Sequence, residues 1–369
     1  MREPKIQKVF MTGDTVGGVW TFTLELARAL GDCGIEVLLA TMGGEASEAQ
    51  RSEAAAIPNL ELITSAYKLE WMEEPWQDVQ ESGLWLLTLH KQFAPDLIHL
   101  NTYGHGALPW SAPVVLTAHS CVLSWWSAVK EEPMPSRWSR YRSEVEYSLK
   151  TADLLTAPSR AMQRTLEENY GSDLPPCRVI ANGRSAAGYG PVEKEPIVLT
   201  AGRLWDEAKN VAAVCRVAGS LPWPVYLAGE ERHPDGTEIG LAGCRTLGWL
   251  PPSELAGWYG RASIYALPAR YEPFGLSAVE AALSGCALVL GDIPSLREVW
   301  NDAALFVPPG DEDRLKAALR ELIEQPDRRQ ELACRAQTRA RTFSPERMAA
   351  AYLDAYTDLA AARRLACAS

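Results

Sequence analysis

Short runs of aliphatic and β-branched residues alternate with longer amphipathic stretches along the first half of the chain. Apolar runs of this length predict buried strands, and the stretches between them have the spacing of helices. The alternation predicts an α/β domain with a parallel sheet and helices on both faces. The expected strands cover residues 8–13, 36–42, 60–65, 96–101, 113–119, 153–159 and 177–183, and the expected helices cover 21–30, 85–93 and 160–170.

The same pattern starts again after a segment rich in glycine, proline and charge at 184–195, which is typical of a linker. We therefore expect a second doubly wound α/β domain of similar size. Ligands of such domains bind in clefts at the carboxyl ends of the strands. The expected strands cover 196–202, 224–230, 244–250, 263–269, 286–292 and 303–309, and the expected helices cover 211–218, 253–259, 276–284 and 313–323, followed by an alanine-rich helix at 344–364.

Composition narrows the class of protein. The 369 residues are 47% hydrophobic and 22% charged, which excludes disorder and collagen-like repeats. The net charge of −11 disfavours non-specific binding to nucleic acid or anionic lipid. No apolar run reaches the roughly 18–20 residues of a membrane-spanning helix. The first residues lack a signal-peptide stretch and the eight cysteines form no CxxC pair, so we expect a cytoplasmic protein with mostly buried free thiols.

Two glycines lie where the first strand meets the first helix, in TGDTVGGVW at 12–20. Gly17 and Gly18 lack side chains, so a phosphate could approach the backbone and the N–H groups at the start of the helix. The segment is neither GxGxxG nor GxxxxGK[ST], which disfavours a dinucleotide oxidoreductase and a P-loop kinase. The alternative is a plain strand-to-helix turn.

Two cations follow the first strand of the second half, in AGRLWDEAKN at 201–210. At the mouth of that domain, the planar guanidinium of Arg203 and the ammonium of Lys209 suit a diphosphate. The alternative is a solvated loop in which these cations pair with Asp206 or Glu207.

The segment RYEPFGLSAVEAALSG at 270–285 carries two carboxylates around an expected helix start. Glu272 lies in the loop and Glu280 on the helix, which begins near Gly275. The amides of Gly275 and Leu276 could hold a phosphate, while the carboxylates accept hydrogen bonds from sugar and ribose hydroxyls. This spacing suits a nucleotide sugar. The alternative for Glu280 is a capping or solvated residue, but its neighbours are apolar, where an unpaired carboxylate is costly.

His119 ends an expected buried strand and is followed by two tryptophans, in VVLTAHSCVLSWW at 114–126. Aromatic faces stack on sugar rings, and a histidine can donate to a sugar hydroxyl or to a leaving phosphate. Ser120, Trp125 and Trp126 are therefore candidate residues for contacts with a sugar. A satisfied core histidine with packing tryptophans is the alternative, and the same choice applies to the whole tryptophan-rich segment 71–138. The other histidines, His90, His99, His105 and His233, have weaker claims.

Asp311, Glu312 and Asp313 resemble a metal-binding triplet, but they directly precede a helical pattern. An aspartate in that position caps the free N–H groups of a helix. Because no other acidic cluster has the spacing of metal ligands, we predict no metal.

Together these residues resemble the family 4 retaining glycosyltransferases with the GT-B fold, over nearly the whole chain. The EX7E motif of that family is similar to Glu272 through Glu280, and its diphosphate-binding pair is similar to Arg203 and Lys209. TLGWLPP at 246–252 resembles the loop that contacts the nucleotide base. The resemblance assigns nucleotide-sugar binding to Gly17, Gly18, Arg203, Lys209, Gly248, Glu272, Phe274, Gly275, Leu276 and Glu280, and catalysis to His119, Arg203, Lys209 and Glu272.

The resemblance also implies a division into two Rossmann-like domains. An acceptor domain would comprise residues 1–188 with a crossing helix at 347–369, and would contact the acceptor through Ser120, Trp125 and Trp126. A donor domain would comprise residues 189–346. Two features depart from the family pattern. The spacing from the arginine to the lysine is six, where five is commoner, and Arg184 follows Asn182 and Gly183 where the family has an aliphatic residue.

The implied activity is that of a metal-independent hexosyltransferase without a cofactor. It would move a sugar from a nucleoside diphosphate sugar, with a UDP-sugar favoured, to an acceptor hydroxyl with retained anomeric configuration. Front-face displacement is the implied mechanism, with Arg203 and Lys209 stabilising the leaving phosphate. The net charge favours a small-molecule or glycan acceptor over one at a membrane surface. Two rivals stay open: a nucleotide-sugar epimerase or hydrolase, and a non-catalytic sugar-binding protein of the same fold.

Overall fold

The computed structural model describes residues 6–130, 132–232 and 241–368. By its internal contacts the chain divides into two compact units, each described separately below. The division falls at 183/184, where the sequence suggested 188/189. The first unit comprises Met1–Ser124, Glu132–Gly183 and Pro345–Ser369, and the second comprises Trp125–Glu131 and Arg184–Ser344.

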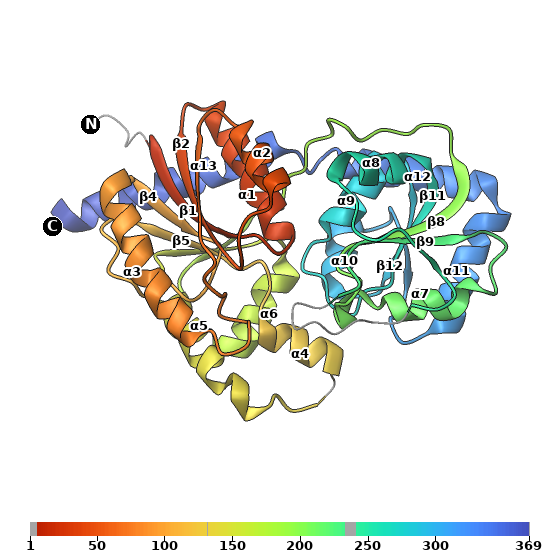
Figure 1. The fold of residues 1–369 in the computed structure, drawn as a ribbon, viewed down its shortest axis with the longest axis horizontal. Helices are drawn as coiled ribbons and strands as arrows, with labels where there is room; N and C mark the ends of the chain where they lie inside the picture. The colour runs from red at the N-terminus through yellow and green to blue at the C-terminus, as the bar shows by residue number, and fades with distance from the viewer. Residues whose placement is uncertain (1–5, 131, 233–240, 369) are drawn as a thin grey trace. The chain divides into compact units, whose positions relative to one another are not determined.

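A seven-stranded parallel sheet forms the centre of the first unit (Figure 1). Its strands are β1 (Lys8–Asp14), β2 (Glu36–Met42), β3 (Leu60–Thr64), β4 (Leu97–Leu100), β5 (Val114–Thr117), β6 (Leu154–Ala157) and β7 (Cys177–Val179). They lie in the order β3-β2-β1-β4-β5-β6-β7, so the direction of winding reverses between β1 and β4. The pairing of β1 with β2 runs in register from Lys8 opposite Glu36 to Asp14 opposite Met42.

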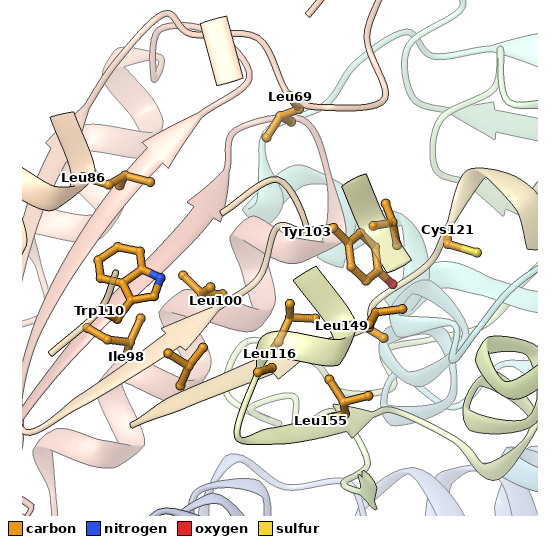
Figure 2. Close-up of a cluster of buried hydrophobic side chains, with 14 of the residues drawn as sticks. Leu69, Leu86, Ile98, Leu100, Tyr103, Trp110, Leu116, Cys121, Leu149 and Leu155 are labelled. Atoms are coloured by element: carbon orange, nitrogen blue, oxygen red, sulfur yellow. The ribbon is translucent and has the colours of Figure 1, made fainter. Parts of the chain in front are cut away.

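Helices cover both faces of this sheet. They are α1 (Gly18–Gly31), α2 (Glu48–Ala55), α3 (Trp76–Phe93), α5 (Ser139–Thr151), α6 (Arg160–Tyr170) and α13 (Pro345–Ala368), whereas α4 (Val122–Lys130) begins in this unit and has most of its residues in the second. Phe10 of β1 belongs to an apolar cluster with residues of α3, α5 and α6, and Figure 2 shows Leu86 and Leu149 in it. Val9 and Met11 point to the other face, into a cluster with α1 and α13. The alternation along β1 therefore sorts its side chains into two cores.

Tryptophans of the segment 71–138 pack against the first of these clusters. Trp110 is buried in the cluster and donates its indole N–H to the carbonyl of His105 at 2.9 Å. The partly buried tryptophans at its edge are Trp71, Trp76, Trp85 and Trp138. For these five side chains the contacts favour packing over acceptor binding.

A six-stranded parallel sheet forms the centre of the second unit. Its strands are β8 (Glu195–Ala201), β9 (Val225–Ala228), β10 (Arg245–Thr246), β11 (Ala262–Leu267), β12 (Ala287–Gly291) and β13 (Leu305–Val307), in the order β10-β9-β8-β11-β12-β13. Its helices are α7 (Val211–Ala218), α8 (Pro252–Arg261), α9 (Leu276–Leu283), α10 (Pro294–Trp300), α11 (Glu312–Glu324) and α12 (Pro326–Ala340). Residues of α7, α11 and α12 form one apolar cluster with the strands, and α8 and α9 also contact the sheet.

The α/β fold with two doubly wound sheets is confirmed, and each predicted apolar run contains a strand. Several strands are shorter than predicted, and 244–250 supplies only the two residues of β10. The hydrophobic pattern does not predict α2, α4, α5, α10 or α12. The capping interpretation of the acidic triplet is confirmed, because the Asp311 carboxylate accepts a hydrogen bond from the backbone N–H of Arg314 at 2.9 Å.

The sequence also led to expectations about membrane-spanning helices and about the burial of the cysteines. Within the described part of the chain, none of the helices combines the length and the apolar character needed to cross a membrane. The seven described cysteine side chains carry free thiols, but only Cys121, Cys215 and Cys286 are buried, while Cys177 and Cys244 are partly buried and Cys33 and Cys334 are exposed, so the expectation of mostly buried thiols is not met. Cys33 lies in the turn after α1 and Cys334 lies within α12, and the apolar pattern alone does not reveal that either side chain is exposed.

A buried polar network joins α13 to the sheet of the first unit. His99 on β4 meets the hydroxyl of Tyr356 through Nδ1 and the hydroxyl of Thr117 through Nε2, both at 2.6 Å. All three side chains are buried. Burial lowers the pKa of His99 to about 3, so the imidazole is neutral and needs one donor and one acceptor as partners. The helix thus supplies a polar partner as well as apolar contacts.

We expect Tyr356→Phe to lower the free energy of unfolding by about 1–3 kcal/mol, because it leaves Nδ1 of His99 buried without its partner. Urea denaturation monitored by circular dichroism measures the change. Tyr147→Phe is the matched control, since Tyr147 is 59% exposed and should change stability by less than about 0.5 kcal/mol. Equal losses in the two variants would contradict the role of the network.

Candidate active site

The candidate site of the second unit lies at the carboxyl edge of its sheet, where the winding reverses. β8 and β11 are paired neighbours, and the remaining strands continue outward from them on either side. The loops that follow these two strands therefore leave the sheet side by side, and open α/β sheets bind ligands at such a reversal. Arg203 and Lys209 lie in the loop after β8, and Glu272 and Gly275 lie in the loop after β11.

Backbone contacts hold the loop after β8 against the loop after β9. The N–H of Gly202 donates to the carbonyl of Ala228 at 3.0 Å. Gly229 has a φ of +142°, and a Cβ at that position would lie 1.7 Å from the carbonyl oxygen of Gly202. Only glycine permits this approach, so Gly229 fixes where the loop with Arg203 begins.

Asp206 organises the same loop. Its carboxylate accepts a hydrogen bond from the backbone N–H of Ala208 and pairs with Arg203, both at 3.0 Å. Trp125, which is grouped with this unit, donates its indole N–H to Asp206 at 2.9 Å. Burial opposes ionisation, but Arg203, Lys209 and these hydrogen bonds hold the pKa of Asp206 below its usual range. The group is therefore a carboxylate at neutral pH.

An ion pair joins the loops after β8 and β11. Nζ of Lys209 donates to Oε2 of Glu272 at 2.5 Å, and the two side chains are only 16% and 11% exposed. The side-chain amide of Asn210 also donates to the carbonyl of Pro268 at 3.0 Å. An isolated charge with so little solvent costs several kcal/mol, so each of the two charged groups stabilises the other.

Helix α9 begins beside this pair. Gly275 precedes the helix with a left-handed φ of +93°, and a Cβ there would lie 3.4 Å from Cγ of Glu272. Among the described residues, no side chain caps the start of α9 and its first turn contains no acidic residue. The amides from Leu276 onward thus suit an anion. Phe274 instead packs edge-on against Phe343, with ring centroids 5.3 Å apart, so its ring is part of the core.

Glu280 on α9 has a partner that the sequence reasoning missed. Nε of Arg184 donates to Oε1 of Glu280 at 2.8 Å, and Nη2 of Arg184 donates to the hydroxyl of Tyr189 at 2.5 Å. The guanidinium and the carboxylate are 16% and 12% exposed. The sequence did show an unusual arginine after Asn182 and Gly183, but nothing in it indicated that this arginine would contact Glu280.

In the first unit the winding reverses between β1 and β4. Gly17 is the N-cap of α1 with an extended backbone, and Gly18 opens that helix. His119 follows β5, and its Nε2 lies 2.7 Å from Oδ1 of Asn101, the residue after β4. The predicted residues of this unit thus gather at the carboxyl edge of its own sheet.

The positions of the remaining predicted residues do not indicate what these residues do. Gly248 follows β10 with a φ of +67°, and its carbonyl accepts a hydrogen bond from Gly229 at 2.8 Å. Ser120 is exposed and Trp126 is buried. His233 lies outside the described residues. The structure therefore gathers Arg203, Lys209, Glu272, Gly275, Leu276 and Glu280 into one constellation, while the contacts of Gly248, Ser120 and Trp126 assign them no role.

Comparisons with known proteins match both halves of the chain. The sequence model described as Glycosyltransferase Family 4 matches residues 16–186, and the one described as Glycosyl transferases group 1 matches residues 184–339. The chain belongs to the family 4-like glycosyltransferases. Over most of its length this glycosyltransferase is 28% identical to a glycogen synthase of Mycobacterium tuberculosis, covering 84% of this chain and 83% of that protein. It is also 28% identical to a D-inositol 3-phosphate glycosyltransferase of Xylanimonas cellulosilytica, covering 94% and 92%.

Solved structures share the architecture of this glycosyltransferase. Sucrose-phosphate synthase from Thermosynechococcus elongatus matches with a TM-score of 0.79 and 19% identity, covering 98% of this chain and 100% of that one. HepE of Anabaena, in complex with UDP and glucose, matches with a TM-score of 0.74 and 16% identity, covering 95% and 99%. The two parallel α/β units are the GT-B fold, and the protein is an enzyme of the hexosyltransferase class.

We expect Gly229→Ala to destabilise this glycosyltransferase by about 1–3 kcal/mol, because the new Cβ forces the loops after β8 and β9 apart. The measurement is Tm by differential scanning calorimetry. Gly219→Ala is the matched control, since Gly219 has a φ of −64° and no described atom lies within 4 Å of a Cβ placed there. Similar Tm values for the two variants would show that the loops do not depend on the close approach.

Proposed function

We propose that this glycosyltransferase moves a hexosyl group from a nucleoside diphosphate sugar to an acceptor hydroxyl, with retention and without a metal. The observation that carries the proposal is the pair of Lys209 and Glu272 beside the uncapped start of α9. A cation and helix-start amides suit a diphosphate, and a carboxylate suits the hydroxyls of the sugar attached to it. A small-molecule or glycan acceptor and a cytoplasmic location remain parts of the proposal.

A UDP-sugar is the favoured donor. Solved structures of HepE of Anabaena hold UDP, UDP with glucose, and UDP-glucose. Because these likenesses lie below 25% identity, they support the donor class only through the shared fold. The charged constellation of the second unit is the independent support, since it offers groups of the right sign for each part of such a donor.

In the proposed reaction, the bond between the anomeric carbon and the β-phosphate oxygen breaks while the acceptor oxygen bonds to the same face of that carbon. The acceptor proton passes to the leaving phosphate oxygen, which gives a glycoside and a nucleoside diphosphate. Arg203, Lys209 and the amides at the start of α9 would stabilise the charge that develops on the phosphate. Glu272 would hold the sugar by its hydroxyls, and Glu280 would accept from the ribose.

A nucleotide panel tests the donor site. We expect UDP to raise Tm more than GDP, ADP or dTDP at the same concentration, because a UDP-sugar is the favoured donor. A ligand at 100 times its Kd adds about 2.7 kcal/mol of stability. Glu280→Ala should weaken UDP binding at least tenfold, whereas Glu324→Ala, which removes an exposed carboxylate of α11, should not. A flat response to the whole panel from folded protein would favour the non-catalytic sugar-binding rival. Turnover of UDP-glucose without an acceptor would favour the epimerase or hydrolase.

Loss of the lysine tests the leaving-group role. We expect Lys209→Met to lower kcat about 100-fold, the typical effect of removing one group that stabilises developing charge. Circular dichroism checks that the variant folds with Glu272 unpaired, and Arg314→Met, at an exposed cation of α11, is the control. Proton NMR of the wild-type product reports its anomeric configuration. An unchanged kcat, or an inverted product from an α-linked donor, would overturn the mechanism.

A further inference from the structure

A chain of neutral polar groups runs along the carboxyl edge of the first sheet to His119. The side-chain amide of Asn101 donates from Nδ2 to the backbone carbonyl of Thr12 at 2.7 Å. The backbone N–H of Asn101 donates to the hydroxyl of Thr12 at 2.9 Å. Oδ1 of Asn101 lies 2.7 Å from Nε2 of His119. Thr12 and Asn101 are buried, so these contacts are not exchanged with solvent.

The backbone carbonyl of Thr12 determines which atoms donate and which accept in this series of hydrogen bonds. A backbone carbonyl only accepts, so the NH2 group of Asn101 must point at Thr12 and its carbonyl oxygen must point at His119. That oxygen also only accepts, which requires a proton on Nε2 of His119. A neutral imidazole has one proton, so Nδ1 carries a lone pair.

The surroundings of His119 keep the ring neutral. Its ring packs edge-on against Phe22 of α1, with centroids 4.5 Å apart. Burial lowers the pKa of His119 below its usual value. His99 on β4 lies close enough for its charge to interact with that of His119, and Tyr352 and Tyr356 on α13 pack against His99. Each of these groups is uncharged at neutral pH, so they do not favour an imidazolium ion.

Nδ1 of His119 is the last atom in this series of hydrogen-bonded groups. Among residues 6–130, 132–232 and 241–368, no group forms a hydrogen bond with this atom. His119 is half-buried, and Nδ1 is not among the fully buried atoms that lack a partner. A ligand that meets this lone pair must bring a proton, so a sugar hydroxyl fits and an unprotonated phosphate oxygen does not.

We propose that Asn101 is a positioning residue that holds His119 as the Nε2–H tautomer, so that Nδ1 accepts a hydrogen bond from a hydroxyl of the transferred sugar. The inference rests on the proposed function for the identity of the ligand. It excludes both donor roles open to a histidine at this place, because with Nε2–H held by Asn101 the ring has no proton left to donate to a sugar hydroxyl or to the leaving phosphate.

The tautomer can be read from the ligand-free protein, without any donor. In protein with 15N-labelled histidine, a two-bond 1H–15N spectrum distinguishes the two tautomers and the imidazolium ion. The His119→Phe spectrum assigns the signal. We expect the Nε2–H tautomer throughout pH 6 to 8, and an Nδ1–H tautomer or an imidazolium ion in that range would overturn the proposal.

The direction of the sugar contact is tested with UDP-glucose and its 2-, 3-, 4- and 6-deoxyfluoro analogues, because fluorine can accept but cannot donate. We expect one analogue to bind wild type at least tenfold more weakly than UDP-glucose does, and to lose that penalty in His119→Phe. Penalties that are all unchanged in His119→Phe, or no penalty at any position, would overturn the contact. If neither UDP nor UDP-glucose binds, the proposed function fails, and the spectrum alone decides the tautomer.

Asn101→Asp tests the positioning role through the pH profile. A carboxylate beside Nε2–H stabilises the imidazolium ion, so the pKa of His119 rises and Nδ1 becomes a donor below that pKa. We expect transfer from UDP-glucose to fall at least tenfold from pH 8 to pH 5 in this variant and to stay level in wild type, because one carboxylate raises a neighbouring pKa by about 1–3 units. Asn169→Asp is the control, because Asn169 also donates to a backbone carbonyl, that of Thr165, at 2.7 Å. A level profile in folded Asn101→Asp would overturn the role of Asn101.

Discussion

The ion pair between Lys209 and Glu272 is the interaction on which the site of the second unit depends. Its two residues are separated by 63 positions in sequence, yet they meet because β8 and β11 are neighbours in the sheet. Neither charge has enough solvent to be stable alone. The contact therefore links the loops after β8 and β11 and keeps a cation beside a carboxylate, a combination that suits a sugar phosphate on the proposed function.

The same principle extends to the other charged groups of this unit. Asp206 pairs with Arg203, and Glu280 pairs with Arg184. On the proposed function, a nucleotide sugar would replace these contacts group by group: phosphate oxygens would take the cations, and hydroxyls would take the carboxylates. Because each of these charged groups already has a partner before the nucleotide sugar binds, none of them is an uncompensated buried charge in the free enzyme. An unpaired carboxylate or an unpaired cation at the same place would be such a charge. The ion pairs of the free enzyme thus preserve the geometry of the site.

The sequence predicts the strands and one part of the site, for a shared physical reason. Buried strands have continuous apolar runs, and the residues just after them must lie at the carboxyl edge of a parallel sheet, which places Arg203 and Glu272. Helices such as α5 and α12 escape prediction because they are mostly polar and their narrow apolar stripes are weak signals. The partners of Glu280 and His119 escape it too, because Arg184 and Asn101 reach them through tertiary contacts that no local spacing encodes.

The two units solve the problem of a polar site in different ways. In the second unit, charged groups are kept in pairs, so their positions depend on each other and on the charge of what binds. At the edge of the first sheet, Thr12, Asn101 and His119 are neutral, and their order is set by which atoms can donate. A neutral chain tolerates burial at low cost, because each hydrogen bond is satisfied and no charge leaves water. The backbone carbonyl of Thr12 on β1 also determines, through the orientation of the Asn101 amide, which nitrogen of His119 holds the proton. An aspartate in place of Asn101 would keep a partner for His119 but would no longer determine the position of the proton, because a carboxylate also stabilises the charged ring.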